Sequence, residues 1–429
     1  MTPIPTIAST RHRAMLPGVT AVCIAAFLTA SMAADAERGG PESIWEAMSD
    51  TDYEKAFSAA RSLAAGGDAA TAAIEKRLKP PRADAAHVAR CVADLGSTKY
   101  ATRQAMAEEL SLIGEPARAA LEKAAAGADS AEARSAAKGL LESLGPFDRA
   151  TASRRQAAWA VRVLETIDTA RSRQVLGALS QPKPPTWLAG QAQAALDRLA
   201  EADRLLGAPV GTTLEFRLLP DPSKHVHTGA LLSPENLQIY ARGLTEKGTD
   251  PSGTPSNGMY YRWFDAGCEL PPTPYASTRE GRSYVLLPNA YEACPPEGLS
   301  ETDPWEIAEV DAVADEAGLP AIRFELGARV THYLTQLTRD NQGRYMAVLA
   351  GGDVLSVMRV EGKMEGAGTI TGLMSRRQAR AVVAAVRAGV PPHWSFGEAI
   401  DKQDIERVKR MLDQFPTLFH GPSPKDPIH

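Results

Sequence analysis

The chain has 429 residues, of which 44% are hydrophobic and 23% are charged, and its formal net charge is −5. This length predicts two or three domains, and the composition is that of a globular protein. The negative net charge gives no general electrostatic attraction to nucleic acid or to anionic lipid. We therefore expect neither as a partner.

The N-terminus has the pattern of a secretory signal. Arg11 and Arg13 precede an apolar run over 15–28, and Ser31-Met32-Ala33 then places small residues at the −3 and −1 positions of a cleavage site. We predict a signal peptide over 1–33 and a periplasmic or extracellular mature protein. The alternative is an uncleaved anchor, the one membrane contact we expect, since no later stretch approaches the ~20 apolar residues of a membrane span.

The chain has four cysteines, and the predicted export decides which of them can form a disulfide. Cys23 leaves with the signal, while Cys268 and Cys294 lie in one later domain. An oxidising compartment permits these two to pair, so we predict a disulfide, with two separate thiols as the alternative. Cys91 then has no partner and is expected to be a small buried apolar residue.

Residues 44–205 are rich in Ala, Leu, Arg and Glu and contain an internal repeat. Shifting the sequence by 47 residues places Tyr53 on Tyr100, and a looser third copy follows after a further 54 residues. The matched positions are Leu63, Leu110 and Leu164; Ile113 and Ile167; Gly67 and Gly114; and Ile74, Leu121 and Val175. Each copy reads as two helices joined by a short turn, which resembles HEAT repeats. Such a stack serves either as a partner-binding face or as a spacer.

After a boundary at 206–211 the pattern changes to that of an α+β domain, over 213–392. Strands are expected at 213–218, 260–264, 284–287 and 307–313. Residues 320–389 then give the order strand, helix, strand, strand, strand, helix. Gly351, Gly352 and Asp353 form the turn of a hairpin, and Ser375 with Gln378 forms a capping box at the last helix. This order predicts an antiparallel sheet with helices on one face.

The same segment resembles the head subdomain of the first periplasmic region of SecD. The resemblance covers 320–392 strongly and extends diffusely back to about 213. It rests on Pro320–Leu326, Leu337-Thr338, Asn341, Gly343, Ala347–Leu349, Gly352, Val354, Ser356, Gly368–Gly372, Ala379 and Arg387–Pro391. SecD itself has six membrane helices that couple its work to protons. We expect none here after the signal, so the resemblance implies a shared fold and contact with unfolded or translocating polypeptide, without a proton-driven motor.

The C-terminal residues complete the expected organisation: a helical cap over 393–418 and a disordered tail over 419–429. Three local patterns were weighed as sites, namely a glycine-rich loop at 366–372, the pair His225 and His227, and acids near Trp305. The loop lacks the spacing of a dinucleotide site, and the histidines have no third ligand nearby in the sequence. We therefore predict no catalytic, cofactor or metal residues.

The sequence thus predicts a multidomain, exported, non-catalytic protein. An all-α HEAT-like solenoid precedes an α+β domain that binds polypeptide or a Sec-type translocation partner. The hairpin at Gly351, Gly352 and Asp353, or a neighbouring sheet edge, is the expected binding surface, because an edge strand pairs with an extended peptide. Two alternatives remain: an extracytoplasmic scaffold without a transport role, and an exported enzyme whose site the sequence does not reveal.

Overall fold

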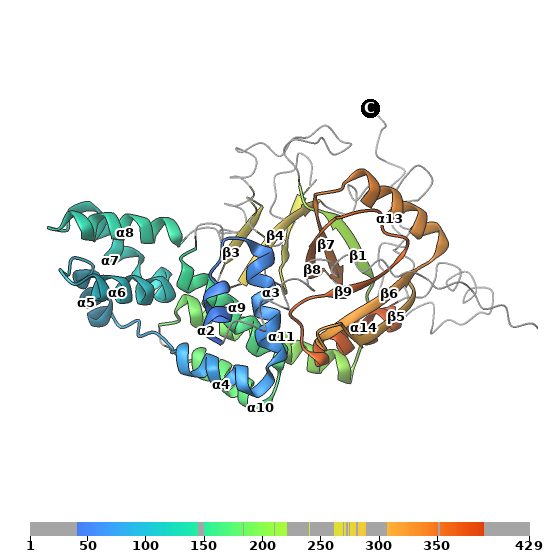
Figure 1. Cartoon of the computed structure of the whole chain (residues 1–429), viewed down its shortest axis with the longest axis horizontal. Helices are drawn as coiled ribbons and strands as arrows, with labels where there is room; N and C mark the ends of the chain where they lie inside the picture. The colour runs from blue at the N-terminus through green and yellow to red at the C-terminus, as the bar shows by residue number, and fades with distance from the viewer. Residues whose placement is uncertain are drawn as a thin grey trace, which may run out of the picture.

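The computed structural model describes residues 41–144, 150–182, 184–209, 211–220, 240, 261–268, 270–271, 273, 275–279, 282–288, 307–350 and 352–389. Helices occupy the N-terminal half of this part, and strands with two helices occupy the C-terminal half (Figure 1). The predicted fold class, all-α followed by α+β, is confirmed. The signal at 1–33, the histidine pair, Cys294, Gly351, the cap and the tail lie outside the described residues.

The helical region runs from residue 41 to residue 207. Its elements are α2 (Pro41–Ala47), α3 (Tyr53–Ala65), α4 (Gly67–Arg77), α5 (Ala85–Asp94), α6 (Tyr100–Ile113), a 3₁₀ turn η1 (Glu115–Ala117), α7 (Arg118–Gly127), α8 (Ala131–Ser143), α9 (Ala152–Ile167), α10 (Ala170–Leu179) and α11 (Trp187–Gly207).

Three helix pairs repeat along this region, as the sequence predicts: α3–α4, α6–α7 and α9–α10. The turn between the two helices of each pair contains a residue with positive φ: Gly67 at +54°, Gly114 at +75° and Asp168 at +48°. These three positions are separated by the sequence offsets of 47 and 54 residues. A residue with positive φ suits such a turn because it changes the chain direction within one residue. The repeat is therefore a structural one.

The matched leucine, isoleucine and valine positions of the three pairs are buried at 8% exposure or less, except Ile167, which is partly buried. The pairs do not stack in a simple row, however. Helices α3 and α4 of the first pair pack against α9 and α10 of the third pair, and the second pair contacts them mainly through α6. HEAT repeats stack each on the next. The assignment to the HEAT class therefore stays a prediction.

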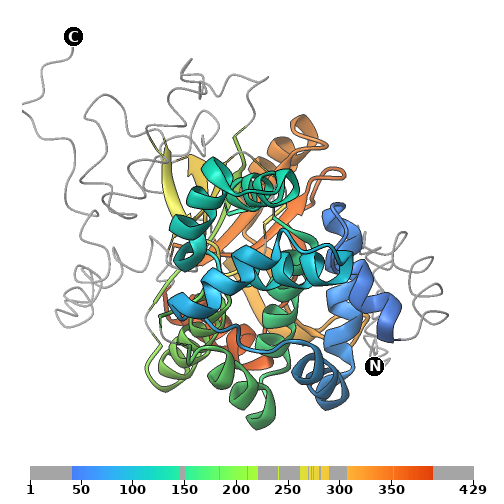
Figure 2. The ribbon, with the colours of Figure 1, turned by 90° about the vertical axis from the view of Figure 1, so that its left-hand side faces the viewer.

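The second pair belongs to a separate group of helices, α5–α8, which we call the outer lobe. It has an apolar core of its own, formed among others by Val88, Cys91, Leu110, Leu121 and Leu140. The lobe lies at one end of the molecule, opposite α13 (Figure 1), and covers part of the sheets when seen from that end (Figure 2). We call the remaining helices, α2–α4 and α9–α11, the inner helices.

The α+β domain follows α11. Its elements are β1 (Leu214–Leu218), β2 (Tyr261–Asp265), β3 (Ala276–Arg279), β4 (Arg282–Pro288), β5 (Ile307–Ala314), β6 (Pro320–Leu326), α13 (Ala328–Asp340), β7 (Tyr345–Ala350), β8 (Asp353–Arg359), β9 (Ala367–Thr371) and α14 (Arg376–Gly389). The predicted order over 320–389 is confirmed.

The strands of the described part form antiparallel sheets ordered β1-β7-β8, β2-β4-β3 and β5-β6-β9. The sequence did not predict the short strand β3, nor that the hairpin β7–β8 pairs with β1 while β6 and β9 pair with β5. Phe216 of β1 and Phe324 of β6 pack with ring centroids 5.2 Å apart. They join the first and third sheets in one core with Val330 and Val383 from the two helices.

The inner helices and the α+β domain share part of their cores. Leu319 and Leu373 of the α+β domain belong to the apolar cluster that contains Trp159, Leu164 and Leu199 of the helices. Helix α14 lies along α11, with an extensive contact between the two. Trp159 is 1% exposed and is therefore a core residue of this shared cluster. Within the described residues, no helix combines the length and the apolar character needed to cross a membrane.

Candidate functional site: the SecD-like head and its junction with the helices

The predicted hairpin forms between β7 and β8. Ala350 pairs with Asp353 across it, and Gly352 has φ +90°, a conformation that glycine adopts readily. Gly352 is half-buried and Asp353 is exposed. The turn therefore exposes part of its backbone to solvent.

The carboxyl of Asp353 has an unusual environment. Its residue is exposed, but the carboxyl lies against protein, and this desolvation raises its pKa to about 6. The negative charges of Asp265 and Glu201 act in the same direction, while Arg282 and Arg198 oppose them. Glu201 and Arg198 belong to α11, so this end of the hairpin is close to the inner helices.

The edge of β8 next to Asp353 is already paired with another segment of the chain. Val354 forms a parallel bridge with Ala266, the residue after β2. A Cβ at Gly267 would lie 3.1 Å from the Val354 carbonyl oxygen, so the two chains approach closely. Ser356 further along β8 donates a hydrogen bond to the Thr371 carbonyl at 3.1 Å. An extended peptide therefore has no free edge at Val354, and the exposed feature is the turn itself.

The outer edge of the third sheet is formed by β5, and a side chain covers part of it. Arg387 of α14 donates to the Val310 carbonyl from Nε at 3.1 Å and from Nη2 at 2.8 Å, and it pairs with Asp311 at 2.5 Å. Charges and covered carbonyls keep sheet edges from pairing with other chains. Arg387 opens the Arg-Ala-Gly-Val-Pro run on which the resemblance to SecD partly rests.

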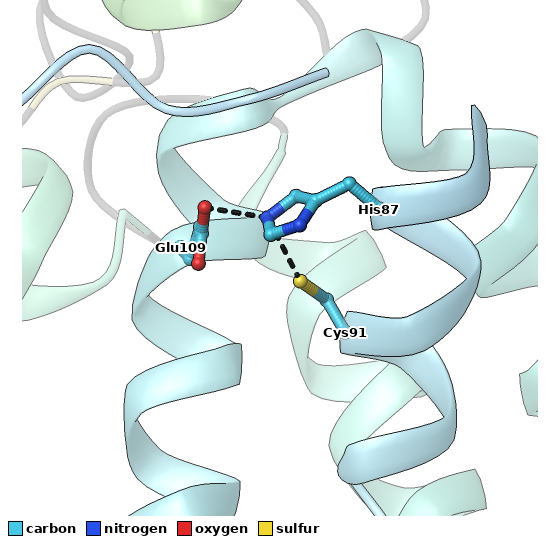
Figure 3. A group of neighbouring side chains, drawn as sticks. All are labelled: His87, Cys91 and Glu109. Carbon is cyan, nitrogen blue, oxygen red and sulfur yellow. Dashed lines mark hydrogen bonds and ion pairs between the residues drawn. The ribbon is translucent and has the colours of Figure 1, made fainter. Parts of the chain in front are cut away.

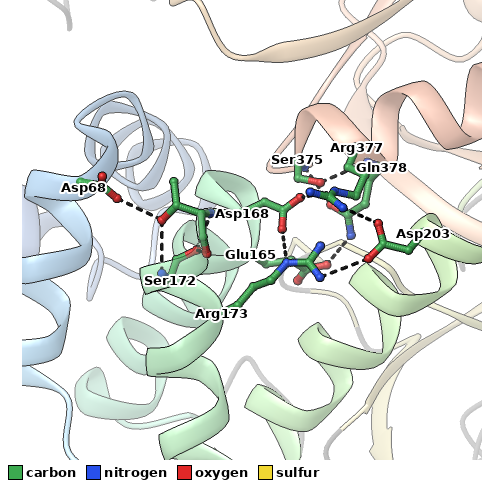
Figure 4. A network of polar contacts seen from close by, with 10 residues as sticks. Asp68, Glu165, Asp168, Ser172, Arg173, Asp203, Ser375, Arg377 and Gln378 are labelled. Atoms are coloured by element: carbon green, nitrogen blue, oxygen red, sulfur yellow. Dashed lines mark hydrogen bonds and ion pairs between the residues drawn. The ribbon is translucent and has the colours of Figure 1, made fainter. Parts of the chain in front are cut away.

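A buried acid joins the helices to the α+β domain, and sequence reasoning missed it. Glu165 of α9 is fully buried and accepts hydrogen bonds from Arg198 at 2.9 and 2.8 Å and from Arg162 at 2.6 Å. It also accepts one from Gln378 at 2.6 Å (Figure 4). Burial alone would raise the pKa of Glu165, but Arg162 and Arg198 outweigh it and hold the pKa below its ordinary value. Arg162 also donates to the Leu373 carbonyl at 3.0 Å.

A second layer of ion pairs surrounds this acid. Arg377 of α14 lies 3.2 Å from Asp168 and 2.6 Å from Asp203, and Arg173 of α10 pairs with the same two acids at 2.6 and 3.2 Å (Figure 4). The hydrogen bond from Arg377 is the main cause of the lowered pKa of Asp203. Asp168 at the end of α9 and Asp203 of α11 thus hold the first turn of α14, and Arg173 of α10 pairs with both acids.

The capping box that orients Gln378 was predicted. The Ser375 amide donates to Gln378 Oε1 at 2.7 Å, and the Gln378 amide donates to Ser375 Oγ at 3.1 Å. Because Oε1 is held by the cap, the Nε2 group faces Glu165. The capping box therefore positions the contact between Gln378 and Glu165, although the sequence of the box gives no sign of that contact.

Of the predicted disulfide, only Cys268 is described. It is buried in a cluster with Phe264, Val285 and Val354. Pairing with Cys294 stays a prediction.

The comparisons with known proteins agree with the resemblance seen in the sequence. The family model for the SecDF P1 head subdomain matches residues 304–392, which comprise β5 to α14. No curated protein matches the chain. The resemblance of this segment to the SecD head is therefore confirmed, and the segment is called the head below.

Two solved SecDF structures are also similar to the chain. One is described as a membrane component that enhances protein export; the match is 21% identical, covers 47% of this chain and 70% of that chain, and has a TM-score of 0.24. The other shows SecDF in a super-membrane-facing form; the match is again 21% identical, covers 47% of this chain and 21% of that chain, and has a TM-score of 0.23.

Proposed function

We propose that this protein is an exported, non-catalytic factor of protein translocation, whose head binds polypeptide or a component of the translocation machinery. The match of residues 304–392 to the SecDF P1 head subdomain carries this proposal. The signal-like N-terminus supports export, because it has the basic, apolar and small-residue order of a secretory signal.

The turn of the β7–β8 hairpin is the contact surface we propose. Gly352 and Asp353 are accessible there, and Asp353 is close to further acids, Asp265 and Glu201. An acidic turn favours basic segments of a polypeptide over acidic ones. The β5 edge is the weaker choice, because an added strand would have to displace Arg387 from the Val310 carbonyl.

Site-specific crosslinking tests the surface. A photo-crosslinking amino acid at position 353 of the full chain should capture an unfolded exported polypeptide. Glu325, an exposed residue of β6 in the same head, is the matched control position and should give little product. Equal capture at both positions would contradict the assignment of the hairpin.

A second function, a scaffold without a transport role, is favoured by one observation. Glu165 and the shared core around Leu373 fix the head to the inner helices, as a rigid spacer would require. Affinity capture from envelope extract separates the two. Translocon components or nascent chains support the first function, whereas envelope assembly proteins without them support the scaffold.

A further inference from the structure

Three potential metal ligands of different chemistry meet in the outer lobe, away from the head. His87 and Cys91 lie one turn apart on α5, and Glu109 projects toward them from α6 (Figure 3). His87 Nε2 lies 2.7 Å from Glu109 Oε1 and 3.4 Å from Cys91 Sγ. The ligand atoms of all three residues lie within 4.8 Å of one another.

The backbone holds this arrangement in place. Residues four apart in a helix lie on the same face, so His87 and Cys91 point the same way. Asp84, the N-cap of α5, accepts a hydrogen bond from the His87 amide at 2.9 Å and fixes the first turn. Cys91 is 1% exposed, while the side chains of His87 and Glu109 are 18% and 28% exposed. The cluster is thus closed on the sulfur side and open to solvent on the other.

The distances suit a small divalent cation. Tetrahedral zinc has bonds of about 2.0–2.1 Å to nitrogen, 2.3 Å to sulfur and 2.0–2.2 Å to oxygen, so its ligand atoms are separated by about 3.3–3.8 Å. The observed separation of 3.4 Å between Nε2 and Sγ falls in that range, whereas Nε2 and Oε1, now 2.7 Å apart, would have to part by about 0.6 Å to bind one zinc ion.

The ligand types narrow the choice of metal. Magnesium and calcium prefer oxygen ligands alone, whereas sulfur with imidazole nitrogen selects zinc or a related transition metal. A thiolate and a carboxylate bring two negative charges, which a divalent cation neutralises. Three protein ligands leave a fourth position for water or a partner's side chain.

A reactive thiol is the other function that a cysteine beside a histidine has in proteins. Cys91 is 1% exposed and belongs to the apolar core of the lobe, so a substrate cannot reach its sulfur. Reactive cysteines are partially exposed. A bound cation would take the thiolate as its ligand and release the thiol proton to the solvent.

We propose that His87 Nε2, Cys91 Sγ and Glu109 Oε1 form a zinc-class metal site that ties α5 to α6 in the outer lobe. The site is separate from the head and does not depend on the function proposed for it.

Cobalt and zinc titrations of the full mature chain test the site. Co²⁺ should bind with one equivalent per chain and give a thiolate-to-cobalt charge-transfer band, which Zn²⁺ then removes. Zinc affinity, measured against a chromophoric chelator, should fall at least about tenfold in Cys91→Ala, His87→Ala and Glu109→Gln. Cys268→Ser and His332→Ala are the matched controls and should keep wild-type affinity.

Folding of the variants is checked separately by circular dichroism. Cys91→Ala leaves a small apolar residue in the core and should retain the helical signal. Zinc should raise the melting temperature of the wild type but not that of Cys91→Ala. The proposal is overturned if the wild type shows no stoichiometric Co²⁺ band, or if Cys91→Ala keeps both the band and the affinity.

Discussion

The outer lobe and the inner helices are built from the same repeated helix pair, but they bury their apolar faces differently. The inner pairs share a core with Leu319 and Leu373 of the α+β domain, whereas the lobe closes around its own core. A helix pair cannot bury its apolar face alone. The first and third helix pairs therefore support the head, whereas the second pair, in the lobe, packs mainly on its neighbouring helices. The surface of the lobe can then serve a separate role.

The polar contacts differ in the same way. At the inner junction the fully buried Glu165 is bound from both sides, by arginines of the helices and by Gln378 of the head. At the lobe, the polar contacts with α9 are small: Ser111 of α6 meets Ser153, and Arg154 donates to the Ser143 carbonyl of α8 at 2.7 Å. The junction fixes the head, and the lobe is joined through a narrow contact.

Removing the buried acid should produce the largest effect. Glu165→Ala leaves Arg162 and Arg198 without their counter-charge, and Arg162 is 4% exposed. Loss of one partner of a buried ion pair costs about 3–5 kcal/mol. Urea unfolding of the full chain, followed by circular dichroism, measures the loss in unfolding free energy.

Glu75→Ala is the control for this substitution. Glu75 pairs with Arg171 at 2.8 Å on the surface, with both side chains about half exposed at 48% and 50%. Exposed pairs contribute about 0–1 kcal/mol. If Glu165→Ala costs no more than Glu75→Ala, the junction does not hold the two regions together.

Substitution of the glycine at the turn of a helix pair should have different effects in the inner helices and in the lobe. Gly67 and Gly114 both have positive φ, which costs an alanine about 1 kcal/mol in the left-handed helical region and more at the ψ of −129° that Gly114 adopts. A Cβ at Gly67 meets nothing within 4 Å, whereas one at Gly114 would lie 2.6 Å from Trp187 Cβ. Gly114→Ala should therefore lose about 3 kcal/mol, through backbone strain and overpacking, and Gly67→Ala about 1 kcal/mol.

Thermal melts of the two variants measure this difference. The Gly114 variant should also loosen the lobe, seen as faster hydrogen exchange in α6 and at the start of α11. Equal losses for both variants would mean that Trp187 does not limit the approach of the lobe.

The sequence predicted what depends on near neighbours and missed what depends on distant ones. The hairpin, the capping box at Ser375 and the offset between Gly67 and Gly114 are local or periodic patterns, and all three are present. The positive φ of Asp168 at the third turn was not predicted, because an aspartate stands there in place of the glycine of the first two turns. The bond from Gln378 to Glu165 spans 213 residues, and no spacing rule reaches that far.

The proposed metal site shows the same limit. His87 and Cys91 are four residues apart, and helical spacing places such a pair on one face; this signal was present in the sequence. The third ligand, Glu109, comes from the next helix, and only the packing of α5 on α6 brings it near.

The smallest effect is expected at the hairpin. The pKa of Asp353 is about 6, above the value of about 3.9 in an unfolded chain. Its contribution to stability is therefore complete below pH 4 and is lost as the pH rises through 6. Asp353→Asn should be more stable than the wild type above pH 6, by roughly 1 kcal/mol after allowance for solvent screening at this exposed residue, and equal to it at pH 4.

Unfolding free energies of the wild type and Asp353→Asn, measured from pH 4 to pH 8, decide this point. A difference that does not change with pH would show that neither burial nor the neighbouring acids raise the pKa of the Asp353 carboxyl.

Calorimetric titration of the full mature chain with an unfolded exported polypeptide tests the central claim most directly. The account predicts saturable binding to the unfolded form, weaker binding to the same polypeptide once folded, and weaker binding of the unfolded form after Asp353→Lys. The absence of measurable heat with the unfolded form, together with no crosslinked product from position 353, would contradict a polypeptide-binding head.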